Sequence, residues 1–172
     1  ALQRALDAVV ARHEILRTRI VATPDGPRQH VDPPRPVQCE LRDLAAPAHA
    51  GTEARAMAEL RAAARRPLDL SRDLLLRAVV VRLGPTEHFV LIETHHIATD
   101  GASKRALLAE LGALYAEYAG GAPAQLPPVR VQYGAYATWQ RSPAAESRAT
   151  ADLAHWERSL AGVPASLDLP TD

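Results

Sequence analysis

The stretch that decides the fold is Phe89-Val90-Leu91-Ile92-Glu93-Thr94-His95-His96-Ile97-Ala98-Thr99-Asp100-Gly101, where an apolar run of strand length meets two histidines, an aspartate and a glycine. Gly84-Pro85-Thr86-Glu87 is a turn signal before the run. After it, leucines and tyrosines recur at three- and four-residue spacing up to Gly120-Gly121, which predicts a helix with a glycine stop. A polar loop between a buried strand and a helix is a common ligand site in α/β proteins. The sequence therefore predicts a functional site in residues 95–101.

Adjacent histidines on a strand point to opposite faces, because side chains alternate with period two. Unless the strand has already ended, one of His95 and His96 should be held inside by a hydrogen bond, while the other faces a cavity. The sequence does not indicate which. A histidine at a strand end is also commonly a satisfied, partly buried polar residue, and Asp100 is a favoured helix N-cap. A metal site is not favoured, because the spacing matches no zinc pattern.

The remaining elements are predicted from periodicity and turn signals. The opening residues already follow a helical stripe with no cap before them, so the chain is expected to begin inside an element of a longer protein. Residues 74–83 and 88–96 should pair as an antiparallel hairpin at the centre of the sheet, because both runs are apolar on both faces. The other expected elements are a strand at 15–22, a turn at 24–27, a strand at 28–31, an extended segment at 37–41, and helices at 52–66, 132–140 and 147–160.

Composition excludes several classes of protein. The 172 residues are 47% hydrophobic and carry 20 basic and 20 acidic side chains, so charge gives no argument for binding nucleic acid or a membrane. No apolar run approaches the length of a membrane helix. The single cysteine, Cys39, excludes an internal disulfide, suits a reducing compartment such as the cytoplasm, and has no activating base nearby in the sequence.

Five stretches together resemble a known family. His95-His96-Ile97-Ala98-Thr99-Asp100-Gly101 resembles the HHxxxDG motif of the condensation domains of nonribosomal peptide synthetases, which are related to chloramphenicol acetyltransferase. Arg12–Ile20 resembles the RHExLRT segment of that family, and Pro67–Ala78 resembles its FDLxxGPLLRA segment, with Leu68 for Phe and Asp73 for Gly. Tyr133–Trp139 resembles YxDYAxW, and Leu169–Asp172 matches LPTD. Order and spacing agree over nearly the whole chain.

The resemblance implies a mixed α/β fold, chloramphenicol acetyltransferase-like, with a mixed sheet packed against helices. Residues 1–172 would form the N-terminal lobe, without its first elements and without the whole C-terminal lobe. The implied reaction is amide-bond formation between an acyl or peptidyl thioester on an upstream peptidyl carrier domain and the amine of an aminoacyl group on a downstream one, both held on the carriers' 4′-phosphopantetheine arms. The domain itself would bind no metal or cofactor and would work beside neighbouring synthetase domains. Because the family's site lies between two lobes, the fragment alone is expected to be inactive.

The resemblance also implies roles for particular residues. His96, beside His95, would accept a proton from the acceptor amine or position that amine. Asp100 would be a structural residue in a salt bridge, with Arg17 as its partner. Gly101 would let substrate approach the backbone and offer its N–H to a developing oxyanion, or it is simply a glycine tolerated in a turn.

Two departures from the family pattern leave alternatives open. Ala102 stands where many members carry a tryptophan, and Ala135 replaces the aspartate of the tyrosine-rich segment. An epimerisation domain carries the same histidines, usually with an aromatic in the pattern that follows them. A condensation-like domain that only recruits or docks other proteins is the second alternative, and Ala135 keeps it open. Tyr136, Trp139 and Trp156 are interpreted as core or lobe-packing aromatics.

Overall fold

The computed structural model describes residues 1–45, 52–164 and 166, in two units, residues 1–132 and residues 133–172, which are described separately. The elements of the first unit are α1 (Leu2–Arg12), the 3-10 helix η1 (Glu14–Arg17), β1 (Thr18–Thr23), β2 (Gly26–Val31), β3 (Cys39–Asp43), α2 (Thr52–Ala64), β4 (Leu76–Arg82), β5 (His88–Thr94) and α3 (Gly101–Tyr118). The second unit contains α4 (Tyr133–Gln140) and α5 (Pro143–Ser159).

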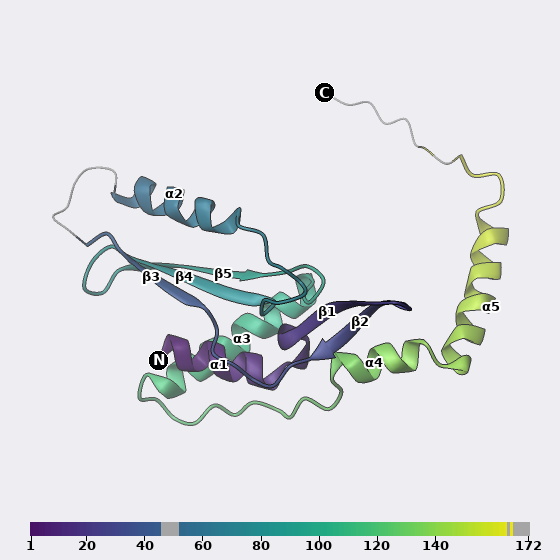
Figure 1. Cartoon of the computed structure of the whole chain (residues 1–172), viewed down its shortest axis with the longest axis horizontal. Helices are drawn as coiled ribbons and strands as arrows, with labels where there is room; N and C mark the ends of the chain where they lie inside the picture. The colour runs from purple at the N-terminus through teal and green to yellow at the C-terminus, as the bar shows by residue number, and fades with distance from the viewer. Residues whose placement is uncertain (46–51, 165, 167–172) are drawn as a thin grey trace. The chain divides into compact units, whose positions relative to one another are not determined.

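The main sheet has the strand order β3-β4-β5 and is mixed (Figure 1). β3 runs parallel to β4, whereas β4 and β5 form the predicted antiparallel hairpin, with Leu76 opposite Thr94. This arrangement confirms the mixed α/β class. The position of β5 differs from the prediction: within the described part of the chain it is an edge strand, and Val90 in it remains 45% exposed.

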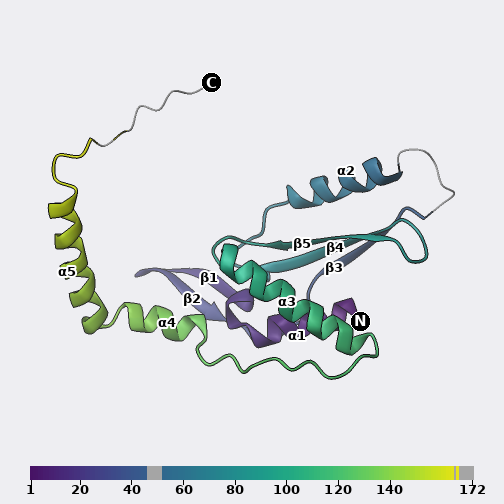
Figure 2. The same ribbon diagram turned by 180° about the vertical axis from the view of Figure 1, so that it is seen from behind.

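Helices cover both faces of this sheet. α1 and α3 lie side by side on one face and α2 lies on the other, as the opposite views in Figures 1 and 2 show. The alternation of side chains along β4 supplies both cores. Leu76 and Ala78 pack with the buried leucines and valines of α1 and α3, while Val79 and Val81 pack with Ala56, Leu60 and Ala63 of α2.

β1 and β2 form a separate two-stranded hairpin, closed by a two-residue turn between Thr23 and Gly26. The strand predicted from residue 15 begins only at Thr18, because residues 14–17 form η1. This turn buries Leu16, which is 2% exposed, against the core shared by α1 and α3.

Helix ends follow the signals in the sequence. α3 stops before Gly120, whose φ of +104° is the left-handed conformation that favours glycine after a helix. α5 begins four residues earlier than predicted, because the side chain of Ser142 accepts a hydrogen bond from the Ala145 N–H and Pro143 occupies the first helical position. Neither α4 nor α5 has a buried residue, and residues 169–172, compared above with LPTD, lie outside the described residues.

Candidate active site

A buried ion pair anchors the strand that leads into the site. The guanidinium of Arg77, a residue only 8% exposed, holds both carboxylate oxygens of Glu93 at 2.9 Å. The same guanidinium donates to the carbonyls of Ala63 at 3.3 Å and Pro67 at 3.4 Å, at the end of α2. Because an arginine fork fits a carboxylate at two points, this contact fixes β5 against the carboxyl end of α2 just before the histidines.

β5 ends at Thr94, so strand alternation does not extend to the histidine loop, which we define as residues 95–100. His95 is fixed by its own backbone and ring. Its N–H donates to the Leu75 carbonyl at 3.2 Å, and its carbonyl accepts from the Ala98 N–H at 3.0 Å. The Ile97 N–H donates to Nδ1 of the His95 ring at 3.0 Å. Since Nδ1 accepts, the neutral ring carries its proton on Nε2.

His96 is the free member of the pair. It is exposed, and within the part of the chain that the structure describes its side chain forms no hydrogen bond or ion pair. The alternative that the sequence left open is thereby resolved: His95 is held and half-buried, and His96 is available to another molecule.

Asp100 is the N-cap of α3. One of its carboxylate oxygens, Oδ1, accepts from the Ser103 N–H at 2.7 Å and from the Ser103 hydroxyl at 2.5 Å. The side-chain and then the backbone hydrogen bond from Ser103 hold the pKa of Asp100 below its ordinary value. A cap of this kind satisfies one of the free N–H groups of the first turn and also fixes the end of the histidine loop.

The expected salt bridge between Asp100 and Arg17 is absent from the ion pairs formed by residues 1–45 and 52–164. Arg17 instead donates to the carbonyl of Asp32 and lies 3.6 Å from a carboxylate oxygen of Glu14. Its Nε is buried and has no hydrogen-bond partner among the described residues. The reason is local: the Asp100 carboxylate turns toward its own helix, and Arg17 turns toward the β2 end of the hairpin.

The Arg17 segment is nevertheless joined to the histidines through backbone. The Leu75 N–H donates to the Leu16 carbonyl at 2.8 Å, and the Leu75 carbonyl accepts from the His95 N–H. Three segments that are far apart in the sequence thus meet in one backbone ladder, which consists of residues 16, 75 and 95.

Gly101 opens α3 and is exposed. A β-carbon at this position would meet no atom within 4 Å. Packing within the described chain therefore does not require glycine here, and the space beside its backbone is open to an incoming group.

Three contacts near the site had little or no signal in the sequence. Glu110 of α3 accepts from Nε of Arg12 at 3.0 Å and lies 2.6 Å from Nε2 of His13, which joins the end of α1 to the helix that follows the histidine loop. Thr94 and Thr99 hydrogen-bond to each other across the loop at 2.8 Å. In the sequence, the only hint of the Thr94–Thr99 contact is that both threonines lie close to the histidines.

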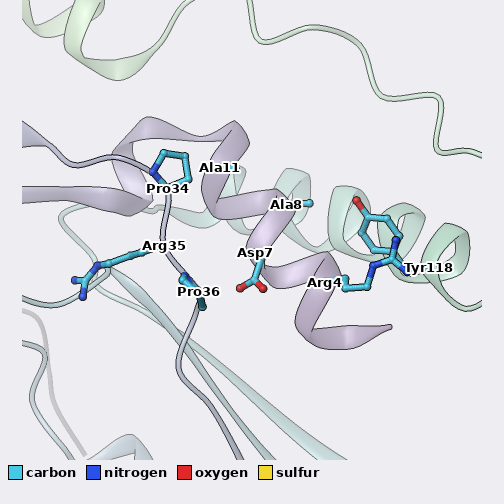
Figure 3. Close-up of a pocket in the computed structure, with 8 residues that line it drawn as sticks. All are labelled: Arg4, Asp7, Ala8, Ala11, Pro34, Arg35, Pro36 and Tyr118. Carbon is cyan, nitrogen blue, oxygen red and sulfur yellow. The ribbon is translucent and has the colours of Figure 1, made fainter.

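A separate pocket of about 430 Å³ lies between α1, residues 34–36 and Tyr118 (Figure 3). The guanidinium of Arg4 lies over the Tyr118 ring, 4.2 Å from its centroid, and Asp7 accepts from the Val37 N–H at 2.8 Å. None of the predicted site residues lines this pocket.

Among the described residues no group of histidine, cysteine, aspartate or glutamate side chains could hold a metal ion.

Comparison with known proteins identifies the family to which this fold and histidine loop belong. The condensation-domain family matches residues 1–172, so the chain belongs to this family. It is 38% identical to malpibaldin synthetase of Mortierella alpina and 35% identical to chondramide synthase cmdD of Chondromyces crocatus, each over 100% of this chain. The solved complex of the X-domain and OxyB from teicoplanin biosynthesis contains a chain that matches with a TM-score of 0.79 and 30% identity over 98% of this chain.

The chain spans only a small part of these relatives: 3% of malpibaldin synthetase, 4% of chondramide synthase and 36% of the solved chain. Within residues 1–45 and 52–164, no helix is long and apolar enough to cross a bilayer.

Proposed function

We propose that this chain contributes the histidine loop to a condensation domain that joins a carrier-bound acyl or peptidyl thioester to the amine of a carrier-bound aminoacyl group. The family match over residues 1–172 supports this assignment. In the proposal the chain is the N-terminal lobe, without its first elements, and a C-terminal lobe completes the site. This chain covers only 36% of the solved relative's chain, which supports the proposal that it is one part of a larger domain.

The observation that carries the proposal is the contrast between the two histidines. His95 is held through its backbone and its ring, while the adjacent side chain of His96 is exposed and forms no hydrogen bond with any residue that the structure describes. A histidine presented in this way can accept a proton at neutral pH or orient a substrate amine.

The reaction needs one proton transfer and one displacement. The acceptor nitrogen attacks the thioester carbon, the C–N bond forms, the C–S bond breaks, and the donor arm leaves as a thiol. An α-amino group titrates near pH 8, so part of it must lose a proton before or during attack. His96 takes or directs that proton, and positioning of two tethered reactants supplies a contribution at least as large.

The proposed partners are two carrier domains, whose phosphopantetheine arms bring the substrates, together with neighbouring domains of a cytoplasmic synthetase. The arms belong to the carriers, and the open space beside Gly101 is where a thioester could approach the backbone.

The test uses the complete parent domain with both carriers loaded separately, and follows the downstream carrier by intact-protein mass spectrometry. Wild type should gain the mass of the donor acyl group. His96→Ala should lower the rate about 10²- to 10⁴-fold if His96 is a general base, and less if it only positions the amine. His88→Ala, which removes an exposed histidine at the opposite end of β5, is the matched control and should transfer normally.

A second function, recruitment of another protein without transfer, is favoured by one observation. The X-domain that this chain resembles was solved in complex with OxyB. Absence of transfer by wild type, with both carriers verified as loaded, would move the assignment to this alternative.

A further inference from the structure

Two threonine hydroxyls close the histidine loop from inside. Thr99 is 6% exposed although its side chain is polar, so its hydroxyl is expected to be satisfied. It donates to the His95 carbonyl at 3.3 Å and lies 2.8 Å from the hydroxyl of Thr94. Thr94 is the last residue of β5, and Thr99 precedes the N-cap of α3.

The direction of these bonds follows from counting hydrogens. A threonine hydroxyl has one hydrogen and two lone pairs. When the Thr99 hydrogen is directed to the His95 carbonyl, Thr94 is the donor in the shorter contact. The chain therefore runs in one direction, from Thr94 through Thr99 to the carbonyl that precedes the His96 peptide nitrogen.

We propose that Thr99 is a positioning residue for His96, with Thr94 as its support. The carbonyl of His95 is one half of the peptide unit whose other half is the nitrogen of His96. That carbonyl also accepts from the Ala98 N–H at 3.0 Å, and the Thr99 hydroxyl adds the side-chain bond that holds it from a second direction. Together they fix the peptide plane from which the His96 backbone continues. The Ile97 contact holds the His95 ring, whereas among the described residues the His96 ring has no hydrogen bond or ion pair, so its direction depends on the backbone that carries it.

This inference rests on the proposed role of His96. Its test uses the complete domain with both loaded carriers, and it measures the maximal rate of acyl transfer and the KM for each carrier. Thr99→Val keeps the shape and removes both hydrogen bonds, so it should lower the maximal rate about 10- to 100-fold, as misplacement of a reacting group does, with KM unchanged. Thr94→Val removes only the supporting bond and should have a smaller effect. Thr99→Ser keeps the hydroxyl and should stay close to wild type.

Thr18→Val is the matched control for stability. Thr18 is 2% exposed and, like Thr99, donates its hydroxyl to a carbonyl four residues earlier, at 2.7 Å from the oxygen of Glu14. Thr18→Val should destabilise the fold to a similar extent, without the loss of rate. Equal losses in Thr18→Val and Thr99→Val would overturn the inference, as would a serine variant as slow as the valine variant.

A double-mutant cycle separates this inference from the proposed function. If Thr99 acts through His96, adding Thr99→Val to His96→Ala should cause no further loss, because the group being aimed is gone. Additive losses would overturn the positioning role while leaving His96 in place. A His96→Ala domain that transfers at the wild-type rate would overturn the proposed role of His96, and the inference with it, whereas absence of transfer by wild type would overturn the proposed function.

Discussion

Asp100 is the N-cap of α3. A capping role and a salt-bridge role predict different effects of replacing this aspartate by asparagine. Asparagine caps helices about as well as aspartate, whereas alanine does not. Asp100→Asn should therefore keep the melting temperature close to wild type, and Asp100→Ala should lower it by a few degrees in a thermal unfolding scan. Equal losses in both variants would indicate that the charge itself is needed, as the expected pair with Arg17 requires.

The pH dependence of this cap follows from the lowered pKa of Asp100, caused first by the side-chain hydrogen bond from Ser103. A carboxyl whose pKa is lower in the folded state contributes stability that is fully present above its unfolded pKa and is lost as pH falls through the folded pKa. The difference between Asp100→Ala and wild type should thus be constant around neutral pH and become smaller in acid, where the charge-dependent part of the cap is lost.

Cys39 should be an unreactive thiol. Burial, and then the negative charge of Asp7, raise its pKa above the ordinary thiol value, and it packs against the core. Since the thiolate is the reactive form, alkylation by iodoacetamide at neutral pH should be about tenfold slower in the folded protein than in urea. Equal rates in both states, measured by mass spectrometry, would show that burial does not protect this thiol.

The positions of the site residues could be predicted in part from the sequence. The histidines and Asp100 lie where a strand meets a helix, as their order in the sequence indicated, because adjacency along the chain survives folding. The partner of Asp100 could not be predicted. Its choice between Ser103, three residues away, and Arg17, 83 positions earlier in the numbering, depends on side-chain directions that no sequence pattern encodes.

Among the elements, α2 and β5 depend on one guanidinium. Arg77→Met should lower the free energy of unfolding by about 3 kcal/mol or more, because it leaves Glu93 unpaired and removes a donor from carbonyls at the end of α2. Glu93→Gln keeps one acceptor and should cost about 1–2 kcal/mol. Both values can be measured by urea unfolding.

The control for this pair is Arg82→Met on the same strand. Arg82 contacts Asp43 at 3.2 Å with side chains 41% and 53% exposed, so its loss should cost less than about 1 kcal/mol. A loss in Arg82→Met as large as in Arg77→Met would contradict the special role of the buried pair.

Element types were predicted better than element positions. Helical stripes and the β4–β5 hairpin carry strong periodic signals, and the structure confirms them. The predictions of a central β5 and of a strand from residue 15 were wrong: β5 is an edge strand in the described chain, and residues 14–17 form a 3-10 helix. Both features depend on which other segments of the chain pack beside them. An apolar strand has the same sequence signal whether one neighbour or two lie beside it.

At the scale of the whole molecule, the second unit has no buried side chain among its described residues, 133–164 and 166. Tyr133, Tyr136 and Trp139 stack along α4 while each remains at least 43% exposed. We therefore expect amide hydrogen exchange in α4 and α5 to be fast in residues 1–172 alone and to slow markedly in the complete domain, where a further lobe would cover these aromatics.

α3 is the internal reference for that experiment. Its buried leucines already pack in the first unit, so its protection should be nearly the same in both samples. Protection of α5 in the isolated chain equal to that of α3 would contradict the expectation.

The backbone ladder through residues 16, 75 and 95 has an evolutionary consequence. Its donors and acceptors are main-chain groups, which every amino acid except proline supplies in full. Because Leu16 and Leu75 are also buried, substitutions by other apolar residues at these two positions can accumulate without dismantling the frame that holds the histidines, whereas an insertion or deletion between them would shift it. Selection on such a site acts on spacing as much as on residue identity, so distant descendants can diverge widely in sequence and still present a histidine in the same place.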